Sequence, residues 1–336
     1  FLLIMDWPNP ALAIEAIPFE ELGFPPLGDI QIPENERYEL DNGLVVYLME
    51  DHDLPLISGS ATFRTGDYLV PGEKAGLAEI TGSAMRLGGT ANHSPDELNE
   101  MLEQRAASVE TSISTTSGSA SFSTLTEDLD SVFSLFTDVI TQPAFDEGKF
   151  ELIKGRTAGG IARRNDDPDD IASREFSKLI YGEQSPYART VEYANLDAIS
   201  REDVMAFYSQ TLAPENTILG IVGDFDTAQM KGLIADRLGE WECDDLMELG
   251  TPPTGDQQKA GLFVVDQPQL TQSSILIGHI GGELRNPYHA SMAVLNEVLN
   301  GFGGRLFNEI RSRQGLAYSV YAFWSARYDH NGIFID

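Results

Sequence analysis

The feature that most constrains the fold is an ordered pattern of apolar segments that occurs twice along the chain. Gly43–Tyr47 and Ile57–Arg64 have the composition of strands, and helical periodicity follows from Ala75 to Leu87. The same order returns in three later segments, at residues 261–265, 274–278 and 288–299. A repeat of this kind predicts two related domains. Because each unit combines strands with helices, we expect α+β domains, each a mixed sheet with helices mainly on one face.

The same pattern divides the chain into parts. An apolar N-terminal run, residues 1–13, closes on Ala11-Leu12-Ala13, as the end of a secretory signal does. The remaining boundaries are an extended lead-in at 14–36, a first domain at 37–243, a linker at 244–258, and the N-terminal part of a second domain at 259–336. Because the second unit is much shorter than the first, we expect it to be truncated. The signal remnant predicts a periplasmic or secreted protein, and the alternative is an ordinary apolar N-terminal segment.

The balance of charge excludes some classes of partner. Lys and Arg number 22 against 53 Asp and Glu, which gives a net charge of −31. A chain this acidic repels phosphate backbones and anionic membrane surfaces, so binding to nucleic acid is not expected. No apolar run approaches the ~20 residues that a membrane-spanning helix needs. The acidity instead favours basic partners or substrates.

Local signals place several elements within the first domain. Ser94 to Glu97 predict a helix start, with Ser as the cap, Pro in the first turn and Glu97 closing a capping box. Val109–Leu125 alternates apolar residues with Ser and Thr, which predicts a hairpin with one solvated face. Other segments are expected to form an apolar helix at 125–140, helices at 146–164, 171–181, 200–210 and 227–238, and a buried strand at 217–222.

Common catalytic patterns are missing from the sequence. It has neither a G-x-S-x-G nucleophile turn nor a Walker A loop. The lone Cys243 sits among acidic residues and indicates a structural thiol. The acidic run 165–170 lacks the Gly and distal Glu of an EF-hand loop, so it predicts a solvated turn. No metal-ligand spacing connects the five histidines, which are His52, His93, His279, His289 and His330.

Two segments nevertheless resemble a known family. Gly76–Thr90 reads GLAEITGSAMRLGGT, and Gly303–Val320 reads GGRLFNEIRSRQGLAYSV. Together they resemble the M16 metallopeptidases, which include pitrilysin, insulysin and the mitochondrial processing peptidase. Val222-Gly-Asp-Phe225 and Trp241 fit the first domain of that family. The resemblance runs from about residue 37 onward.

The resemblance implies where a zinc site would lie. Active members carry His-x-x-Glu-His after Gly-Leu-Ala, where the histidines hold zinc and the Glu is the general base. Here Glu79 replaces the first His, Gly82 the base and Ser83 the second His. The later Glu ligand falls at Gly159 or Gly160. One carboxylate and one hydroxyl cannot form a three-ligand zinc site, so we expect no catalytic zinc in this chain.

The second segment keeps its reactive residues. Arg311 and Tyr318 match the pair that family members supply from the second domain. The resemblance implies that the guanidinium holds a substrate carbonyl and that the phenol donates to the oxyanion. Gly315 predicts a turn between them. The alternative is an Arg in a surface ion pair and a Tyr packed in the core.

These features lead to one principal hypothesis and two alternatives. The chain is expected to be the non-catalytic subunit of a heterodimeric, short-chain M16 peptidase. Its partner would bring zinc, the general base and water, while this chain would bring Arg311 and Tyr318 to the shared site for peptides. The first alternative is a purely structural, peptidase-like scaffold subunit. The second is a protein that binds basic peptides without cleaving them.

Overall fold

The computed structural model describes residues 33–243, 245–253, 260–327 and 333–335, with isolated positions between 21 and 29. The predicted signal remnant at 1–13 lies outside the described residues, as do His330 and parts of the lead-in and of the linker. The N-terminal unit Phe1–Glu34 is separate from the main unit Asn35–Asp336. The main unit contains every helix and strand considered below.

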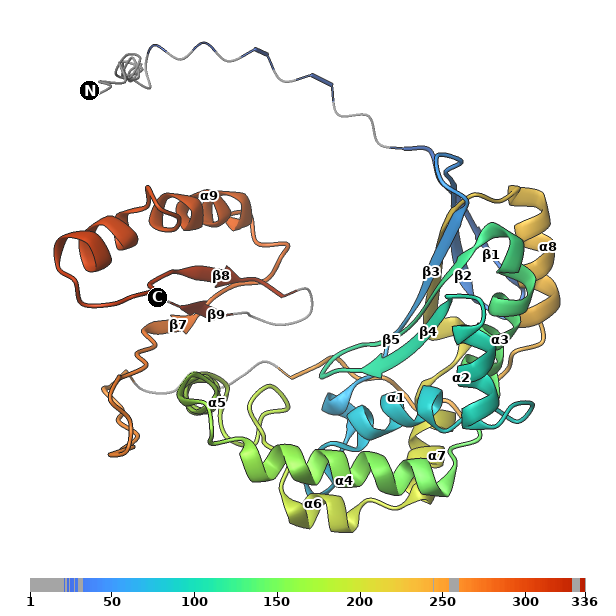
Figure 1. Cartoon of the computed structure of the whole chain (residues 1–336), viewed down its shortest axis with the longest axis horizontal. Helices are drawn as coiled ribbons and strands as arrows, with labels where there is room; N and C mark the ends of the chain where they lie inside the picture. Colours follow the sequence, from blue (N-terminus) through green and yellow to red (C-terminus); the bar gives the residue numbers. More distant parts are fainter. Residues whose placement is uncertain are drawn as a thin grey trace, which may run out of the picture. The chain divides into compact units, whose positions relative to one another are not determined.

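A six-stranded sheet forms the centre of the first domain (Figure 1). Its strands are β1 (Glu36–Glu39), β2 (Val45–Glu50), β3 (Leu56–Phe63), β4 (Ser108–Ile113), β5 (Gly118–Leu125) and β6 (Thr217–Gly223). They lie in the order β1-β2-β6-β3-β5-β4. Only β2 and β6 pair in parallel, and the other neighbours are antiparallel. The sheet is therefore mixed, as the sequence predicts.

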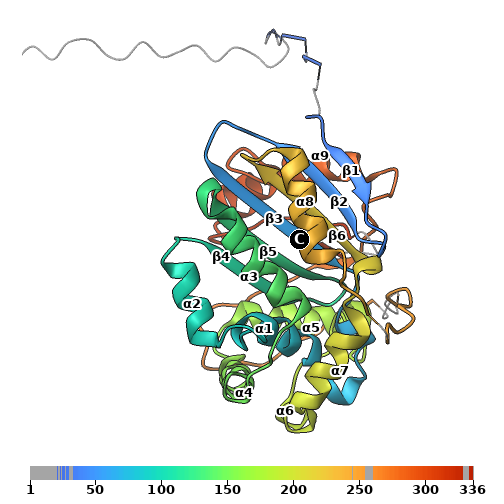
Figure 2. The same ribbon diagram turned by 90° about the vertical axis from the view of Figure 1, so that its right-hand side faces the viewer.

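Helices cover one face of this sheet (Figure 2). Helices α1 (Leu77–Leu87), α2 (Pro95–Glu103), α3 (Leu129–Thr141) and α8 (Thr227–Leu238) contact the sheet directly. Helices α4 (Glu147–Arg163) and α7 (Arg201–Thr211) pack against α1, α6 (Tyr193–Ala198) packs against α4, and α5 (Pro168–Tyr181) follows α4. Buried aromatic side chains join the two layers. Phe122 of β5 packs against Phe133 and Phe136 of α3, at ring-centroid distances of 5.7 and 4.8 Å. Burial of these rings supplies much of the apolar contact that holds α3 on the sheet.

The two faces of β3, β4 and β5 differ in polarity because side chains alternate along a strand. Ile57, Ala61 and Phe63 of β3 are buried toward the helices. Hydroxyl side chains dominate the other face, at Ser58, Ser60, Thr62, Ser108, Ser112, Ser119, Ser121 and Ser123. The predicted hairpin with one solvated face is confirmed.

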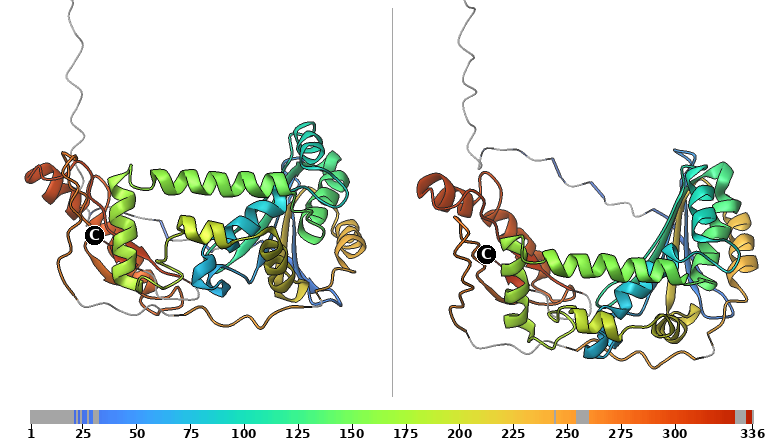
Figure 3. Two further views of the ribbon diagram at one scale, coloured as in Figure 1. Left: turned by 90° about the horizontal axis from the view of Figure 1, so that it is seen from below. Right: turned by 60° about the horizontal axis from the view of Figure 1, so that its bottom comes forward.

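Helix α4 extends beyond the helices that cover the sheet and leads into α5 (light green in Figure 3). Its buried residues, Phe150 and Ile153, both lie in its N-terminal half. In the acidic run that follows, residues 165–167 form a turn and residues 168–170 begin α5, which Asp167 caps by accepting a hydrogen bond from the Asp169 amide at 2.8 Å.

The second domain contributes a smaller sheet and a helix. Strands β7 (Gly278–Ile280), β8 (Phe323–Ser325) and β9 (Ile333–Ile335) pair antiparallel in the order β7-β9-β8, and α9 spans His289–Leu299. The predicted helix is confirmed, but the strand predicted at 261–265 is wrong, and the strand predicted at 274–278 is shifted, because β7 begins only at Gly278. Leu262 is 92% exposed and Val264 81% exposed. No strand pairs with this segment among the described residues, and a strand without a neighbour has no ladder to stabilise it.

Candidate functional site

Helix α1 holds the three positions at which the resemblance implies a zinc site. Glu79 is exposed, Ser83 is half-buried and Gly82 is buried. A Cβ atom at Gly82 would lie 2.3 Å from the amide nitrogen of Ile113 and 2.7 Å from the carbonyl carbon of Ser112, both in β4. The Thr111 hydroxyl also donates to the Gly82 carbonyl at 2.6 Å. The position of the general base is therefore filled by the backbone of β4.

The position of the third ligand has a different environment. At Gly159 and Gly160 of α4, an added Cβ would meet nothing within 4 Å. A carboxylate would fit there, but the sequence does not supply one. Among the residues that the structure describes, no three His, Cys, Asp or Glu side chains are grouped so that they could hold a metal ion. The donors present at these four positions do not fit a zinc ion.

Arg311 and Tyr318 lie in direct contact in the second domain. Arg311 belongs to a seven-residue π-helix, Phe307–Arg313, and the chain turns after it at Gly315, whose φ is +64°. The Leu316 amide donates to the Ile310 carbonyl at 3.0 Å and closes this turn. The Arg311 Cζ then lies 4.7 Å from the centre of the Tyr318 ring. The turn predicted at Gly315 is present and brings the pair together.

The environment of this pair differs from the alternative of a surface ion pair and a buried ring. Tyr318 is 84% exposed. The neighbouring Arg313 pairs with Glu309, whereas Arg311 forms no ion pair with any described residue. The N–H donors of Arg311 are thus not committed to a carboxylate, and a guanidinium in this state can donate to a carbonyl or an oxyanion.

A third residue contacts Arg311 and was not identified from the sequence. The Arg311 Cζ lies 4.8 Å from the centre of the Phe307 ring. The available signal was their spacing of four residues, which places side chains on the same side of a helix. That signal is weak, because many apolar residues stand at this spacing for reasons of packing.

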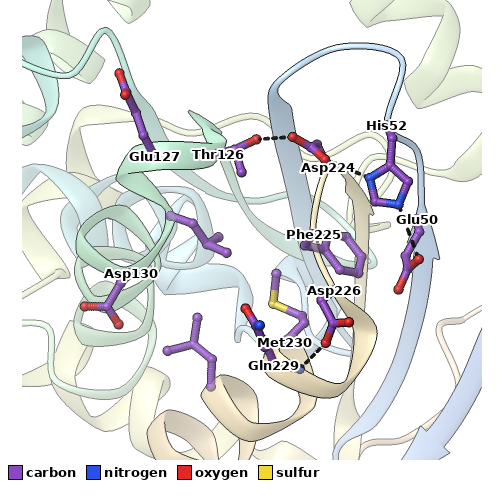
Figure 4. A pocket seen from close by; sticks show the side chains of 12 residues that line it. Glu50, His52, Thr126, Glu127, Asp130, Asp224, Phe225, Asp226, Gln229 and Met230 are labelled. Carbon is purple, nitrogen blue, oxygen red and sulfur yellow. Dashed lines mark hydrogen bonds and ion pairs between the residues drawn. The ribbon is translucent and has the colours of Figure 1, made fainter.

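Sequence reasoning also missed a polar pocket in the first domain, with a volume of about 560 Å³ (Figure 4). It lies where the parallel strands β2 and β6 end, between α3 and α8. His52 contacts Asp224 through Nδ1 at 2.7 Å and Glu50 through Nε2 at 3.4 Å. The Thr126 hydroxyl donates to Asp224 at 3.0 Å, and the Thr227 amide donates to Glu50 at 2.7 Å. The signal was the acidic sequence that follows each of the two strands.

These contacts perturb the protonation of the three groups. Hydrogen bonding to Asp224, and then to Glu50, raises the pKa of His52. The His52 contact lowers the pKa of Asp224, and hydrogen bonds from Thr227 lower that of Glu50. Both carboxylates are already engaged by donors of this chain, so the cluster ties the strand ends together.

Two family models match the chain. The model described as insulinase (peptidase family M16) matches residues 63–191, and the model described as peptidase M16 inactive domain matches residues 198–335. The chain belongs to peptidase family M16. The first match contains helix α1, and the second contains Arg311 and Tyr318. Both segments that carried the resemblance therefore fall within the matched regions.

Several known proteins are similar to the chain. An uncharacterized zinc protease of Mycobacterium leprae is 27% identical over 210 residues, which are 59% of this chain but only 45% of that protein. The uncharacterized zinc protease YmxG of Bacillus subtilis is 23% identical over 302 residues, which are 89% of this chain and 72% of that protein. The non-peptidase homolog YmxG of Helicobacter pylori is 22% identical over 279 residues, which are 81% of this chain and 63% of that protein.

The fold agrees with a solved structure. The peptidase M16 inactive domain from Pseudomonas fluorescens superposes with a TM-score of 0.82 at 22% identity, over 90% of this chain and 73% of that chain. This likeness supports the M16 fold for both domains. Within the described part of the chain, no helix combines the length and the apolar character that a membrane crossing requires.

Proposed function

We propose that this M16 protein is a non-catalytic subunit that supplies Arg311 and Tyr318 to the zinc site of a partner subunit. The partner would be an M16 chain with an intact zinc helix, and the substrates would be peptides. The observation that carries the proposal is a contrast within one chain. The backbone of β4 fills the position of the general base, while Arg311 contacts an exposed Tyr318 and forms no ion pair with any residue that the structure describes.

Each residue of the pair has a defined role in this proposal. The Arg311 guanidinium would hold a carbonyl of the substrate backbone through its N–H donors. The Tyr318 phenol would donate to the oxyanion that forms at the scissile carbon. The zinc, the base and the attacking water would all belong to the partner. We further propose a periplasmic or secreted location, on the basis of the apolar N-terminal segment.

Reconstitution with the partner tests the proposal. The isolated chain should not cleave peptides, and cleavage should appear when the zinc-bearing subunit is added. In the complex, Arg311→Ala or Tyr318→Phe should lower kcat by about 10²–10³-fold, as loss of an oxyanion donor does. The measurement is steady-state cleavage of a fluorogenic peptide, with assembly checked by size-exclusion chromatography.

A neighbouring arginine provides the control for this experiment. Arg313 lies two residues from Arg311 but is 75% exposed and paired with Glu309, so Arg313→Ala should leave turnover unchanged. Equal losses in Arg311→Ala and Arg313→Ala would refute a specific role for Arg311. Peptide cleavage by the isolated chain with stoichiometric zinc would refute the proposal as a whole.

A structural scaffold is the second candidate function, favoured by the name of the H. pylori relative, a non-peptidase homolog. A scaffold predicts that Arg311→Ala changes neither kcat nor KM in any complex that contains this chain. The same variant therefore distinguishes the two candidates.

A further inference from the structure

The guanidinium of Arg311 lies over two aromatic rings. Its Cζ is 4.8 Å from the centre of Phe307 and 4.7 Å from the centre of Tyr318. Both distances fall within the range of cation–π contacts. Arg311 is also without a carboxylate partner among the described residues, although the whole chain has a net charge of −31. In this segment Arg311 therefore contacts aromatic rings, whereas the neighbouring Arg313 pairs with an acidic side chain.

The local backbone explains how both rings reach one side chain. Phe307 and Arg311 are four residues apart on the same π-helix, so their side chains are neighbours along it. Tyr318 arrives from the other direction, because Gly315 adopts the left-handed conformation at φ +64° and reverses the chain. The Gly315 amide donates to the Arg311 carbonyl at 3.1 Å and fixes this reversal next to Arg311 itself.

Aromatic contacts constrain an arginine differently from an ion pair. A carboxylate occupies the N–H donors at the edge of the guanidinium. A ring instead contacts the flat face, which limits the orientation of the group and leaves its edge available to an acceptor. The two rings are not equivalent in this respect, since Tyr318 carries a phenol that is proposed to donate to the substrate. Phe307 has no polar atom and can act only through Arg311.

We infer that Phe307 is a positioning residue, whose ring orients the Arg311 guanidinium so that its donors face a substrate carbonyl. This inference rests on the proposed function for the catalytic consequence, but the orientation itself is a property of this chain alone. Phe302 provides a matched control, because it contacts Phe307 edge-on at 5.1 Å, is 83% exposed and belongs to the same segment.

The first experiment measures the orientation in the isolated full chain. The Arg311 side-chain protons should resonate upfield of their random-coil positions, because they lie over aromatic rings, in NMR spectra of arginine-labelled protein. Phe307→Leu should move these resonances toward random-coil values, Phe307→Tyr should retain them, and Phe302→Leu should leave them nearly unchanged. Unchanged Arg311 resonances in Phe307→Leu would overturn the inference.

The second experiment measures the consequence in the complex with the zinc-bearing subunit. Phe307→Leu should lower kcat by about two- to fivefold with little change in KM, as expected for loss of one exposed cation–π contact, and Phe307→Tyr should restore it. An equal loss in Phe302→Leu would overturn the inference, since it would indicate general packing. If Phe307→Leu shifts the Arg311 resonances but Arg311→Ala leaves kcat unchanged, the orientation stands and the proposed function fails.

Discussion

Gly82 and Gly160 both occupy helix positions at which active M16 members are expected to carry an acidic side chain, but their surroundings differ. A Cβ added at Gly82 would lie 2.3 Å from the Ile113 amide nitrogen of β4, whereas one added at Gly160 would meet open space. The sequence shows that both carboxylates are missing. It does not show that one position is sterically closed, because the closing strand is about thirty residues away in the sequence.

This difference predicts opposite effects of the same substitution. Gly82→Ala should lower the free energy of unfolding by about 1–3 kcal/mol, because the new methyl group must displace the β4 backbone. Gly160→Ala should raise it by about 0.5–1 kcal/mol, because alanine is a better helix former at an exposed position. Urea denaturation followed by circular dichroism measures both. A Gly82→Ala protein as stable as the unmodified chain would contradict the packing described for α1 and β4.

Among the residues proposed for the site, the sequence pointed to Arg311, Tyr318 and the turn that joins them, but not to the contact of Phe307 with Arg311. Gly315 is a strong local signal, since few other residues adopt a positive φ. Phe307 carries no comparable signal. Its contact with Arg311 depends on the side-chain directions in a π-helix, which the sequence pattern does not specify.

At the scale of elements, helix starts were the most predictable feature. The capping box at Ser94 is present in full, because the Ser94 amide donates to Glu97 at 2.9 Å and the Glu97 amide donates to the Ser94 hydroxyl at 3.4 Å. All residues that form such a helix-start signal lie within four consecutive positions. A strand instead depends on a partner that is distant in sequence, which is why the apolar run at 261–265 was assigned wrongly.

The contacts around His52 connect the end of β2, the segment that follows β6 and the start of α8, and the strength of these contacts depends on pH. The pKa of His52 is raised, so its contribution to stability is present below its ordinary value of 6.5 and is lost as the pH rises through the raised value. The pKa values of Glu50 and Asp224 are lowered, so their contributions are lost when the pH falls below the ordinary carboxyl range. The contacts are therefore complete between about pH 4.5 and 6.5.

A substitution at His52 tests this dependence. His52→Gln should lower Tm slightly within that window and have a smaller effect above it, where His52 is already neutral. The effect is expected to be small because the side chain is 60% exposed and the interaction is screened by solvent. Differential scanning fluorimetry across the pH range measures it, with His93→Gln as a control outside the pocket. A destabilisation of equal size at every pH would contradict the assignment to charge.

At the scale of the whole molecule, the negative charge is unevenly distributed. Residues 261–327 contain five arginines and four acidic residues, so the excess of acid lies in the rest of the chain. The segment that carries Arg311 and Tyr318 is therefore close to neutral, in a protein whose net charge is −31. The net charge favoured basic partners or substrates, but a sum over the whole chain gives no indication of this separation.

The strand order of the large sheet also governs how the first domain can assemble. Among the strands that the structure describes, β2 pairs only with β1 and with β6, although β6 begins 167 residues after the end of β2. The hairpin formed by β1 and β2 therefore has no attachment to the other strands until β6 is in place. Because non-local pairing is slow, we expect β3, β4 and β5 to gain amide protection first during refolding.

Pulsed hydrogen exchange with mass spectrometry measures this order, and earlier protection of β2 than of β5 would contradict it. On the ribosome the consequence is sharper, since synthesis proceeds from the N-terminus at about 5–20 residues per second. At that rate synthesis reaches the start of β6 roughly 10–30 seconds after the end of β2, and the exposed edge of β2 stays unpaired for that time beside a growing, strand-rich chain. The part of the sheet that is synthesised first is the part that joins it last, which makes the nascent hairpin the natural point for a chaperone to engage.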